Sequence, residues 1–301
     1  MKKVLVTGAS GFIGRHTLKY LLPEFDEVHG VYARKPLEEF KDVKWHRVDL
    51  LDSDYRDKLI NTVRPTHLLH FAWYAEPGKY AHSLMNIKWL QSSLDLIQRF
   101  TEHGGERTVC AGTCFEYDFN YGLCSEYKTP KNPETIYGVC KNSLQNIIHH
   151  FSKKSELSSA WGRIFYLYGP YEYPSRLVSS VILSLLKNEN ARCSEGTQFK
   201  DFLHVDDVAR AFVSLLKSRV EGAVNIGSGY PVRVKDVVIK IGELLNKRNM
   251  IDLGARPTPA SEPPLIVADT KRLFEEVYWE PVFDLTAGLE DTIHWWKKSI
   301  G

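Results

Sequence analysis

The chain has 301 residues, of which 43% are hydrophobic and 25% are charged, and its net charge is +2. These values are ordinary for a globular protein and argue against disorder. The charges are spread along the chain, so no basic stripe is available for nucleic acid, and no apolar run is long enough to cross a membrane. Because the first residues also lack the apolar run of a signal peptide, we expect a cytoplasmic protein with neither kind of partner.

Short β-branched runs alternate with amphipathic segments in the first half of the chain. Strands are predicted at residues 3–7, 28–32, 44–48, 67–71, 107–111 and 160–165. Helices are predicted at residues 12–22, 55–62, 83–103 and 133–155, the last with Asn132 as N-cap and Pro133 in its first turn. This alternation predicts an α/β fold with a Rossmann-type, doubly wound parallel sheet over residues 1–167.

The pattern changes after residue 167, where proline and glycine become frequent. Further helices are predicted at residues 177–187, 206–217, 234–245 and 285–298. We interpret residues 168–301 as a smaller α/β cap that binds substrate over the carboxyl edge of the sheet. Segments near 198–228, including the strand-like residues 223–226, are expected to return to the main sheet.

A glycine-rich turn follows the first predicted strand. Gly8, Gly11 and Gly14 have a G-x-x-G-x-x-G spacing directly before the first predicted helix. Such a turn lets the backbone approach a pyrophosphate closely, and the start of the helix offers unpaired N–H groups to the phosphates. The sequence therefore predicts a dinucleotide-binding site; the alternative is a purely structural turn between strand and helix.

The end of the second predicted strand bears on the identity of the dinucleotide. After Tyr32 and Ala33 the chain has Arg34, and no acidic residue stands where a ribose 2′-hydroxyl would be bound. An arginine fork suits a 2′-phosphate, so NADP(H) is favoured and NAD(H) remains possible. Asp49, after the third strand, is placed either to bind the adenine amino group or to cap a turn.

A phenol and an ammonium group are predicted on one helix face. Tyr137 and Lys141 are four residues apart, and Thr113 supplies a hydroxyl just beyond the strand at 107–111. The Lys141 cation and the positive end of the helix are expected to lower the pKa of Tyr137, which would make it an acid/base at neutral pH. Together with the glycine turn, these three residues are typical of hydride-transfer chemistry.

Several motifs resemble the extended short-chain dehydrogenase/reductases of the nucleotide-sugar epimerase/dehydratase kind. They extend along nearly the whole chain and lie at residues 7–14, 70–72, 137–141, 163–170, 200–207, 225–229 and 279–281. The resemblance implies that Tyr137 is the acid/base, that Lys141 binds the nicotinamide ribose and that Thr113 bonds the reacting sugar oxygen. It also implies a homodimer that pairs the helix at 83–103 with the helix around 137–150 in a four-helix interface.

The resemblance and the motifs together define the expected site. The residues expected to contact the cofactor are Gly8, Ser10, Gly11, Phe12, Ile13, Gly14, Tyr32, Ala33, Arg34, Asp49, Leu50, Phe71, Ala72, Trp73, Tyr137, Lys141 and Phe165. The residues expected to contact the substrate are Ser83, Cys114, Tyr166, Arg176, Lys200 and Arg256. By resemblance, Lys200 and Arg256 would bind the substrate diphosphate, although Lys200 replaces an arginine and Tyr166 replaces a frequent asparagine.

Departures from the family pattern narrow the reaction. The 4,6-dehydratases carry Asp-Glu directly after the threonine, and C3/C5 epimerases carry an acid two places after it, whereas this chain has Cys114 and Phe115. Glu116 is one place late, and only a local bulge would bring it into the site. What remains is the minimal set for hydride transfer and protonation of one oxygen.

The hypothesis that follows is the NADPH-dependent reduction of a nucleoside-diphosphate 4-keto-6-deoxysugar. The alternatives are an NAD-dependent C4 epimerase or C4 dehydrogenase of nucleotide sugars and, more remotely, a non-enzymatic NADP-binding regulator. The five cysteines include no C-x-x-C pair, so we expect reduced, mostly buried thiols and no metal site.

Overall fold

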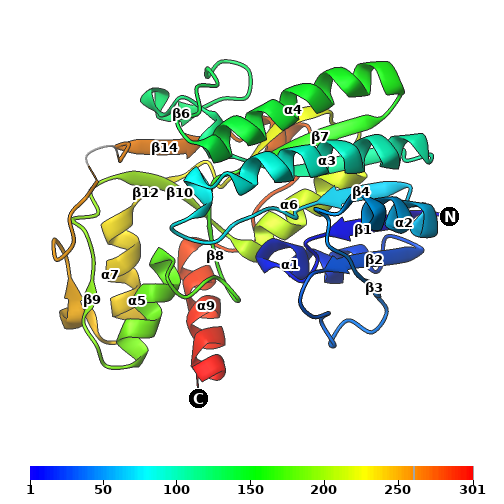
Figure 1. The fold of residues 1–301 in the computed structure, drawn as a ribbon. Helices are drawn as coiled ribbons and strands as arrows, with labels where there is room; N and C mark the ends of the chain where they lie inside the picture. Colours follow the sequence, from blue (N-terminus) through cyan, green and yellow to red (C-terminus); the bar gives the residue numbers. More distant parts are fainter. Residues whose placement is uncertain (260–261, 301) are drawn as a thin grey trace.

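Seven strands form the central sheet of the computed structural model, which describes residues 1–259 and 262–300 (Figure 1). In spatial order they are β11 (Gly222–Ile226), β7 (Ser158–Ile164), β5 (Arg107–Thr113), β4 (His67–His70), β1 (Lys3–Thr7), β2 (Glu27–Tyr32) and β3 (Lys44–Arg47). Neighbouring strands all pair in parallel. The predicted Rossmann-type α/β class is therefore confirmed.

Helices cover both faces of this sheet, and each face has its own hydrophobic core. The helices of this half are α1 (Phe12–Leu21), α2 (Ser53–Val63), α3 (Met85–Glu102), α4 (Ile136–Ser155) and α6 (Val205–Lys217). Val4 and Val6 of β1 belong to the core under α1 and α6, whereas Leu5 belongs to the core under α2, α3 and α4. This alternation follows from the two-residue period of a strand.

The order of the strands also positions a binding crevice. β1 lies between β2 and β4, so the chain reverses its direction of travel across the sheet at this strand. In open α/β sheets, ligands bind outside the carboxyl ends of the strands at such a switch point. The glycine turn after β1 lies at that end of the sheet.

The start of α4 differs from the sequence-based prediction. Thr135, not Asn132, is the N-cap, and its hydroxyl accepts a hydrogen bond of 3.1 Å from the Gly138 N–H. Pro133 therefore precedes the helix instead of lying in its first turn. The correction places Tyr137 within the first turn, because α4 begins at Ile136.

The second half of the chain is interleaved with the first. Its five-stranded sheet contains β12 (Pro231–Arg233), β10 (Phe199–His204), β14 (Leu265–Ala268), β6 (Leu123–Cys124) and β8 (Tyr166–Tyr168). A two-stranded sheet pairs β13 (Ile251–Asp252) with β9 (Ala191–Arg192). Within the segment expected to return to the main sheet, β11 joins that sheet, whereas β10 pairs in the second one.

Helices complete this half. They are α5 (Leu177–Leu186), α7 (Val234–Leu244), α8 (Lys271–Glu275) and α9 (Leu285–Ile300), and short 3-10 turns lie at η1 (Tyr80–His82), η2 (Cys114–Glu116), η3 (Phe119–Tyr121) and η4 (Arg248–Met250). Buried residues of α5, α7 and α9 share one hydrophobic core. Figure 1 shows this group beside the central sheet, with α9 next to α1 across the boundary.

Cation–π and aromatic contacts join the two halves at this boundary. The Arg15 guanidinium of α1 lies 3.4 Å from the ring centroid of Tyr171, and the centroid of that ring is 4.5 Å from that of Trp295 on α9. His16 lies 3.2 Å from the carbonyl oxygen of Pro170. The helix that follows the glycine turn is thereby tied to the last helix of the chain.

Candidate active site

The turn between β1 and α1 requires glycine at two positions. Gly8 has φ +67°, and a Cβ there would lie 3.0 Å from the Ala72 nitrogen. A Cβ on Gly14 would lie 2.2 Å from the Gly8 carbonyl oxygen. The N-cap of α1, Gly11, contributes no side-chain cap to the first N–H groups of the helix. This donor set and the close backbone approach fit the pyrophosphate of a dinucleotide.

Residues after β4 line the same turn. The Ala72 N–H donates to the Thr7 hydroxyl at 3.2 Å, which keeps Ala72 beside Gly8. Phe71 instead packs its ring against Phe212, with 4.9 Å between the centroids. Of the expected cofactor residues in this segment, Ala72 therefore lies against the glycine turn and Phe71 lies against the core.

The expected adenosine side of the site lies at the ends of β2 and β3. Ala33 and Arg34, which follow Tyr32, are both exposed. The Arg34 side chain is therefore accessible to a ribose phosphate. Asp49 accepts a hydrogen bond of 3.0 Å from the Leu51 N–H, which is the turn-capping role left open by the sequence. Leu50 is buried, and its carbonyl oxygen accepts from Arg56 at 2.6 Å.

Hydroxyl and aromatic groups surround Tyr137. Its phenol lies near the Thr113 side chain at the end of β5, which acts to lower the Tyr137 pKa. The rings of Tyr80 and Phe115 flank it, with centroids 4.9 Å and 6.3 Å away. The structure thus brings together Thr113 and Tyr137, two of the three residues of the expected catalytic set.

Lys141 points away from this phenol. Its Nζ donates to the carbonyl oxygen of Ala111 at 2.7 Å and lies 3.8 Å from the ring centroid of Trp73. Trp73 is held in turn by a hydrogen bond of 2.7 Å from its Nε1 to Asn86. Trp73, expected to contact the cofactor, therefore covers the ammonium group.

This geometry corrects the expected electrostatics of the pair. Burial raises the pKa of Tyr137 above its ordinary value, and the neighbouring Tyr80 adds to this effect. Burial also lowers the pKa of Lys141 to about 8, against the opposing influence of Glu116 and Cys110. The expectation that Lys141 lowers the pKa of Tyr137 was wrong, because the ammonium faces Ala111 and Trp73.

Glu116 is turned into the protein interior. Its carboxylate accepts from Arg163 Nε at 2.6 Å, from Trp161 Nε1 at 2.9 Å and from the Thr113 N–H at 2.9 Å. Both Glu116 and Arg163 are fully buried. No bulge brings this carboxylate toward Tyr137, and Phe115 occupies the position beside the phenol.

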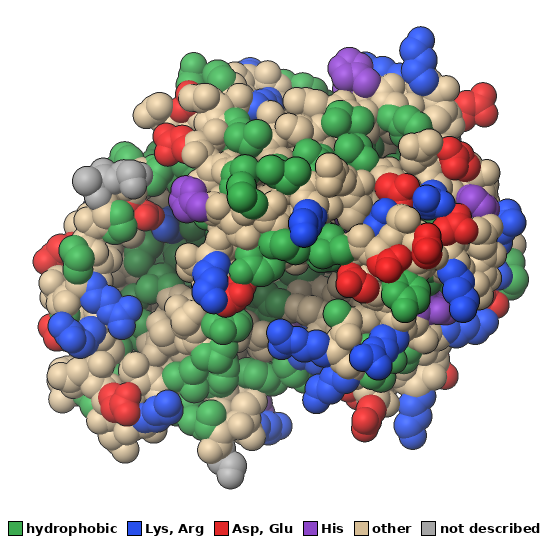
Figure 2. Space-filling model, viewed as in Figure 1, with side chains coloured by type: hydrophobic (Ala, Val, Ile, Leu, Met, Phe, Trp, Pro, Cys, Tyr) green, Lys and Arg blue, Asp and Glu red, His purple; other side chains and the backbone are tan. Residues whose placement is uncertain are grey.

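Among the residues expected to contact substrate, Lys200 is held by an aromatic ring and a carboxylate. Lys200 Nζ lies 4.4 Å from the ring centroid of Tyr166 and 2.5 Å from a carboxylate oxygen of Glu262. Arg176, on the loop before α5, places its guanidinium 5.4 Å from the Tyr80 ring centroid. Figure 2 shows a hollow in this face of the molecule, with hydrophobic side chains inside it and Lys or Arg at its edge.

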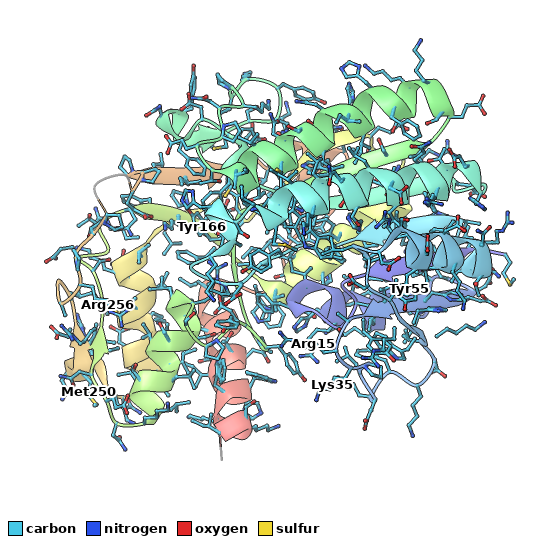
Figure 3. All side chains as sticks on the ribbon, viewed as in Figure 1. Arg15, Lys35, Tyr55, Tyr166, Met250 and Arg256 are labelled. Atoms are coloured by element: carbon cyan, nitrogen blue, oxygen red, sulfur yellow. The ribbon has the colours of Figure 1, made fainter. Side chains whose placement is uncertain are left out.

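Other residues expected to contact substrate or cofactor have different surroundings. Cys114 and Phe165 are buried in a small core with Tyr117, so they face the interior. The Ser83 hydroxyl accepts from the Met85 N–H at 3.2 Å at the start of α3. Arg256 is exposed, and Figure 3 shows it beside α7, whereas Tyr166 lies in the middle of the molecule.

Sequence reasoning missed three residues of this region: Tyr80, Arg163 and Glu262. Each reaches its partner through a loop or a neighbouring strand, so no spacing along the chain indicates it. Within residues 1–259 and 262–300, no group of three His, Cys, Asp or Glu side chains could hold a metal ion. No helix in the same part of the chain is long and apolar enough to cross a membrane.

A profile described as the NAD dependent epimerase/dehydratase family matches residues 4–227. The chain belongs to this family. The resemblance inferred from the motifs is therefore confirmed, and the glycine turn, Thr113, Tyr137 and Lys141 all lie within the matched residues.

Relatives within the NAD dependent epimerase/dehydratase family span the whole chain. CDP-abequose synthase of Salmonella typhimurium is 25% identical over 303 residues, which cover 96% of this chain and 97% of that protein. UDP-glucuronate 4-epimerase 2 of Arabidopsis thaliana is 27% identical and covers 97% of this chain and 75% of its own length. The solved UDP-glucose 4-epimerase of Thermus thermophilus in complex with NAD has a TM-score of 0.87 at 23% identity, covering 99% of this chain and 100% of its own.

Proposed function

We propose that this member of the family catalyses the NADPH-dependent reduction of a nucleoside-diphosphate 4-keto-6-deoxysugar to the 4-hydroxy sugar. The observation that carries the proposal is the set of side chains around Tyr137. Thr113, Tyr80 and Phe115 surround the phenol, and the carboxylate of Glu116 is bound to Arg163 instead. A site in which no carboxylate of the described residues hydrogen-bonds the phenol suits a reaction at one carbon–oxygen bond.

Tyr137 is the proton donor of the proposed reduction. When bound, NADPH supplies a hydride to the C4 carbon of the sugar. The phenol of Tyr137, whose pKa burial raises, is protonated at neutral pH, so it holds the proton that the C4 oxygen needs. Thr113 holds the same oxygen by a hydrogen bond, and Lys141, which faces Ala111 and Trp73, is left with the role of binding the nicotinamide ribose.

Arg34 supports NADPH over NADH. The side chain is exposed just after β2, and Lys35 follows it in the same loop. A guanidinium fork binds a phosphate through two parallel hydrogen bonds. Figure 3 shows Lys35 and Arg15 on the same side of the molecule, near α1.

An NAD-dependent C4 epimerase is the second candidate. Two of the similar proteins are named as 4-epimerases, and the solved structure of the Thermus thermophilus protein contains NAD. An epimerase uses the same phenol, first as a base and then as an acid, so the residues around Tyr137 also suit it. The two candidates differ in whether the cofactor is consumed.

We also propose a homodimer formed through α3 and α4 and a cytoplasmic location. α3 and α4 lie side by side (Figure 1), and Ile87 of α3 and Val139 and Ile147 of α4 are exposed. Exposed apolar side chains on neighbouring helices favour burial against a second copy. All five cysteines are buried as free thiols, which suits a reducing compartment.

The test is the oxidation of NADPH in the presence of CDP-, dTDP-, GDP- or UDP-linked 4-keto-6-deoxysugars. We expect wild-type protein to consume NADPH with at least one of them. Tyr137→Phe should lower turnover by about a hundred- to ten-thousand-fold while NADPH binding stays near normal, because only the transferable proton is lost. Turnover that survives in Tyr137→Phe would contradict the mechanism, and an oxidised cofactor that is never consumed would favour the epimerase.

A further inference from the structure

Tyr80 lies on the short turn η1, and hydrogen bonds from the Asn86 side chain hold the backbone of this turn. The buried side chain of Asn86 donates to the carbonyl oxygen of Tyr80 at 2.7 Å and to that of Ser83 at 2.8 Å. The same amide accepts from Trp73, the residue that covers Lys141. η1 therefore has a defined position although it belongs to a loop.

The Tyr80 ring borders the phenol of Tyr137. The two rings are nearly perpendicular, at 88°, with 4.9 Å between their centroids. A sugar whose reacting oxygen meets the Tyr137 hydroxyl must then have other ring atoms within reach of Tyr80. The half-buried Tyr80 side chain offers both an apolar face for sugar C–H groups and a hydroxyl for a sugar hydroxyl.

Cations also lie near Tyr80 and its neighbour Tyr166. Arg176 places its guanidinium 5.4 Å from the Tyr80 ring centroid, and Lys200 stands over the nearby Tyr166 ring. Burial raises the pKa of Tyr166, and Tyr80 is among the groups that add to the effect, so the two phenols share one environment. Tyr80 thus packs against the Tyr137 ring and also lies near the Arg176 guanidinium, while Lys200 is ion-paired with Glu262.

A nucleoside diphosphate sugar needs groups of these kinds: a proton donor at the reacting carbon, a surface for the remainder of the hexose and positive charge for the diphosphate. We propose that Tyr80 is a specificity-determining residue that contacts the hexose and selects which ring face meets Tyr137. This inference rests on the proposed function for the identity of the sugar. The contact itself applies equally to a ketoreductase and to a C4 epimerase.

A binding experiment tests the contact without requiring turnover. The affinities of CDP-, dTDP-, GDP- and UDP-hexoses and of the matching free nucleoside diphosphates are measured by calorimetry with NADPH present. Tyr80→Ala should weaken the sugar nucleotide that wild type prefers by roughly tenfold and its free diphosphate by less than twofold. Tyr80→Phe keeps the ring and loses the hydroxyl, so its loss should be smaller, roughly threefold.

The control and the opposing outcomes are defined by the same measurements. Tyr278→Phe changes a tyrosine that is 87% exposed and distant from Tyr137 in the sequence, and it should leave both affinities unchanged. Equal weakening of sugar nucleotide and free diphosphate in Tyr80→Ala would overturn the sugar contact in favour of a role at Arg176. Wild-type protein that gains no affinity from the sugar would overturn it as well.

Product analysis tests the choice of face. With a 4-keto substrate, wild type should give one C4 configuration by NMR, whereas Tyr80→Ala should give a mixture and a raised KM. A single configuration with an unchanged KM in Tyr80→Ala would overturn the proposal. If wild type never oxidises NADPH but Tyr80→Ala still loses the sugar-dependent affinity, the proposed reaction fails and the Tyr80 contact stands.

Discussion

The amino group of Lys141 is buried. Only the Ala111 carbonyl accepts a hydrogen bond from it among the described residues, and the faces of Trp73 and Trp161 lie beside it. Burial therefore lowers its pKa to about 8, close to the pH at which the protein would work. Lys141, which was expected to carry a permanent positive charge, therefore changes its charge near pH 8.

This position predicts how activity depends on pH. The ammonium form is present below pH 8 and is lost as the pH rises through about 8, so kcat/KM should fall over that range. Lys141→Met should have low activity without this fall. Lys153→Met changes an exposed lysine of the same helix and should keep the wild-type profile; a wild-type profile that stays flat from pH 7 to 10 would contradict the assignment.

Glu116 and Arg163 form a second residue-scale feature, an ion pair buried beneath Thr113. Glu116→Gln should destabilise the protein by about 3–5 kcal/mol, because it leaves the Arg163 charge buried without a counter-charge. The double variant Glu116→Gln with Arg163→Met should regain part of that loss. The measurement is urea unfolding followed by circular dichroism.

The exposed pair of Lys271 and Glu275 is the matched control for this ion pair. Its side chains are 3.8 Å apart and largely in water, so Glu275→Gln should change the free energy of unfolding by less than about 1 kcal/mol. A Glu116→Gln variant as stable as wild type, or a double variant no better than the single one, would contradict the interpretation.

At the scale of elements, the first turn of α4 determines where the phenol stands. Thr135 caps this turn and Tyr137 lies within it. Thr135→Ala should cost about 1 kcal/mol of stability and should lower kcat several-fold, since the loosened turn carries Tyr137. Thr135→Ser retains the hydroxyl and should remain near wild type in both unfolding and steady-state assays; equal losses in the two variants would refute the capping role.

Long, periodic elements could be predicted from the sequence, and short ones could not. The strands and helices of the central sheet have hydrophobic periods that identify them, so the Rossmann-type fold was correctly inferred. β6, β9 and β13 are two residues long and show no periodicity. The start of α4 was misplaced because Asn132 and Thr135 are both suitable caps, and only the packing decides between them.

The residues of the candidate site also fall into two groups, those that the sequence could identify and those that it could not. The glycine turn, Tyr137 and Lys141 could be identified because their spacing along the chain is itself the signal. Tyr80 reaches Tyr137 and Glu262 reaches Lys200 from separate loops, and their positions follow from tertiary structure alone. The direction of the Tyr137 pKa shift was also beyond the sequence, because it depends on where the Lys141 ammonium points.

At the scale of the whole molecule, the apolar surface of α3 and α4 leads to a prediction about assembly. Wild-type protein should sediment as a dimer at micromolar concentration, and Ile147→Lys should produce monomers, because it places a charge within the proposed interface. Val282→Lys charges an exposed apolar residue outside these helices and should leave the dimer intact. A wild-type monomer at tens of micromolar would contradict the proposed dimer.

The edge strand β11 has a consequence for the order of events on the ribosome. Gly222–Ile226 pairs along β7 from Ala160 to Ile164, so the sheet that begins with the third residue is completed only after residue 226 has been synthesised. Until then the nascent chain carries an open edge at β7, a surface that readily recruits strands from other chains. A fragment that stops at residue 167 should therefore aggregate, because it lacks the strand that covers the edge of β7.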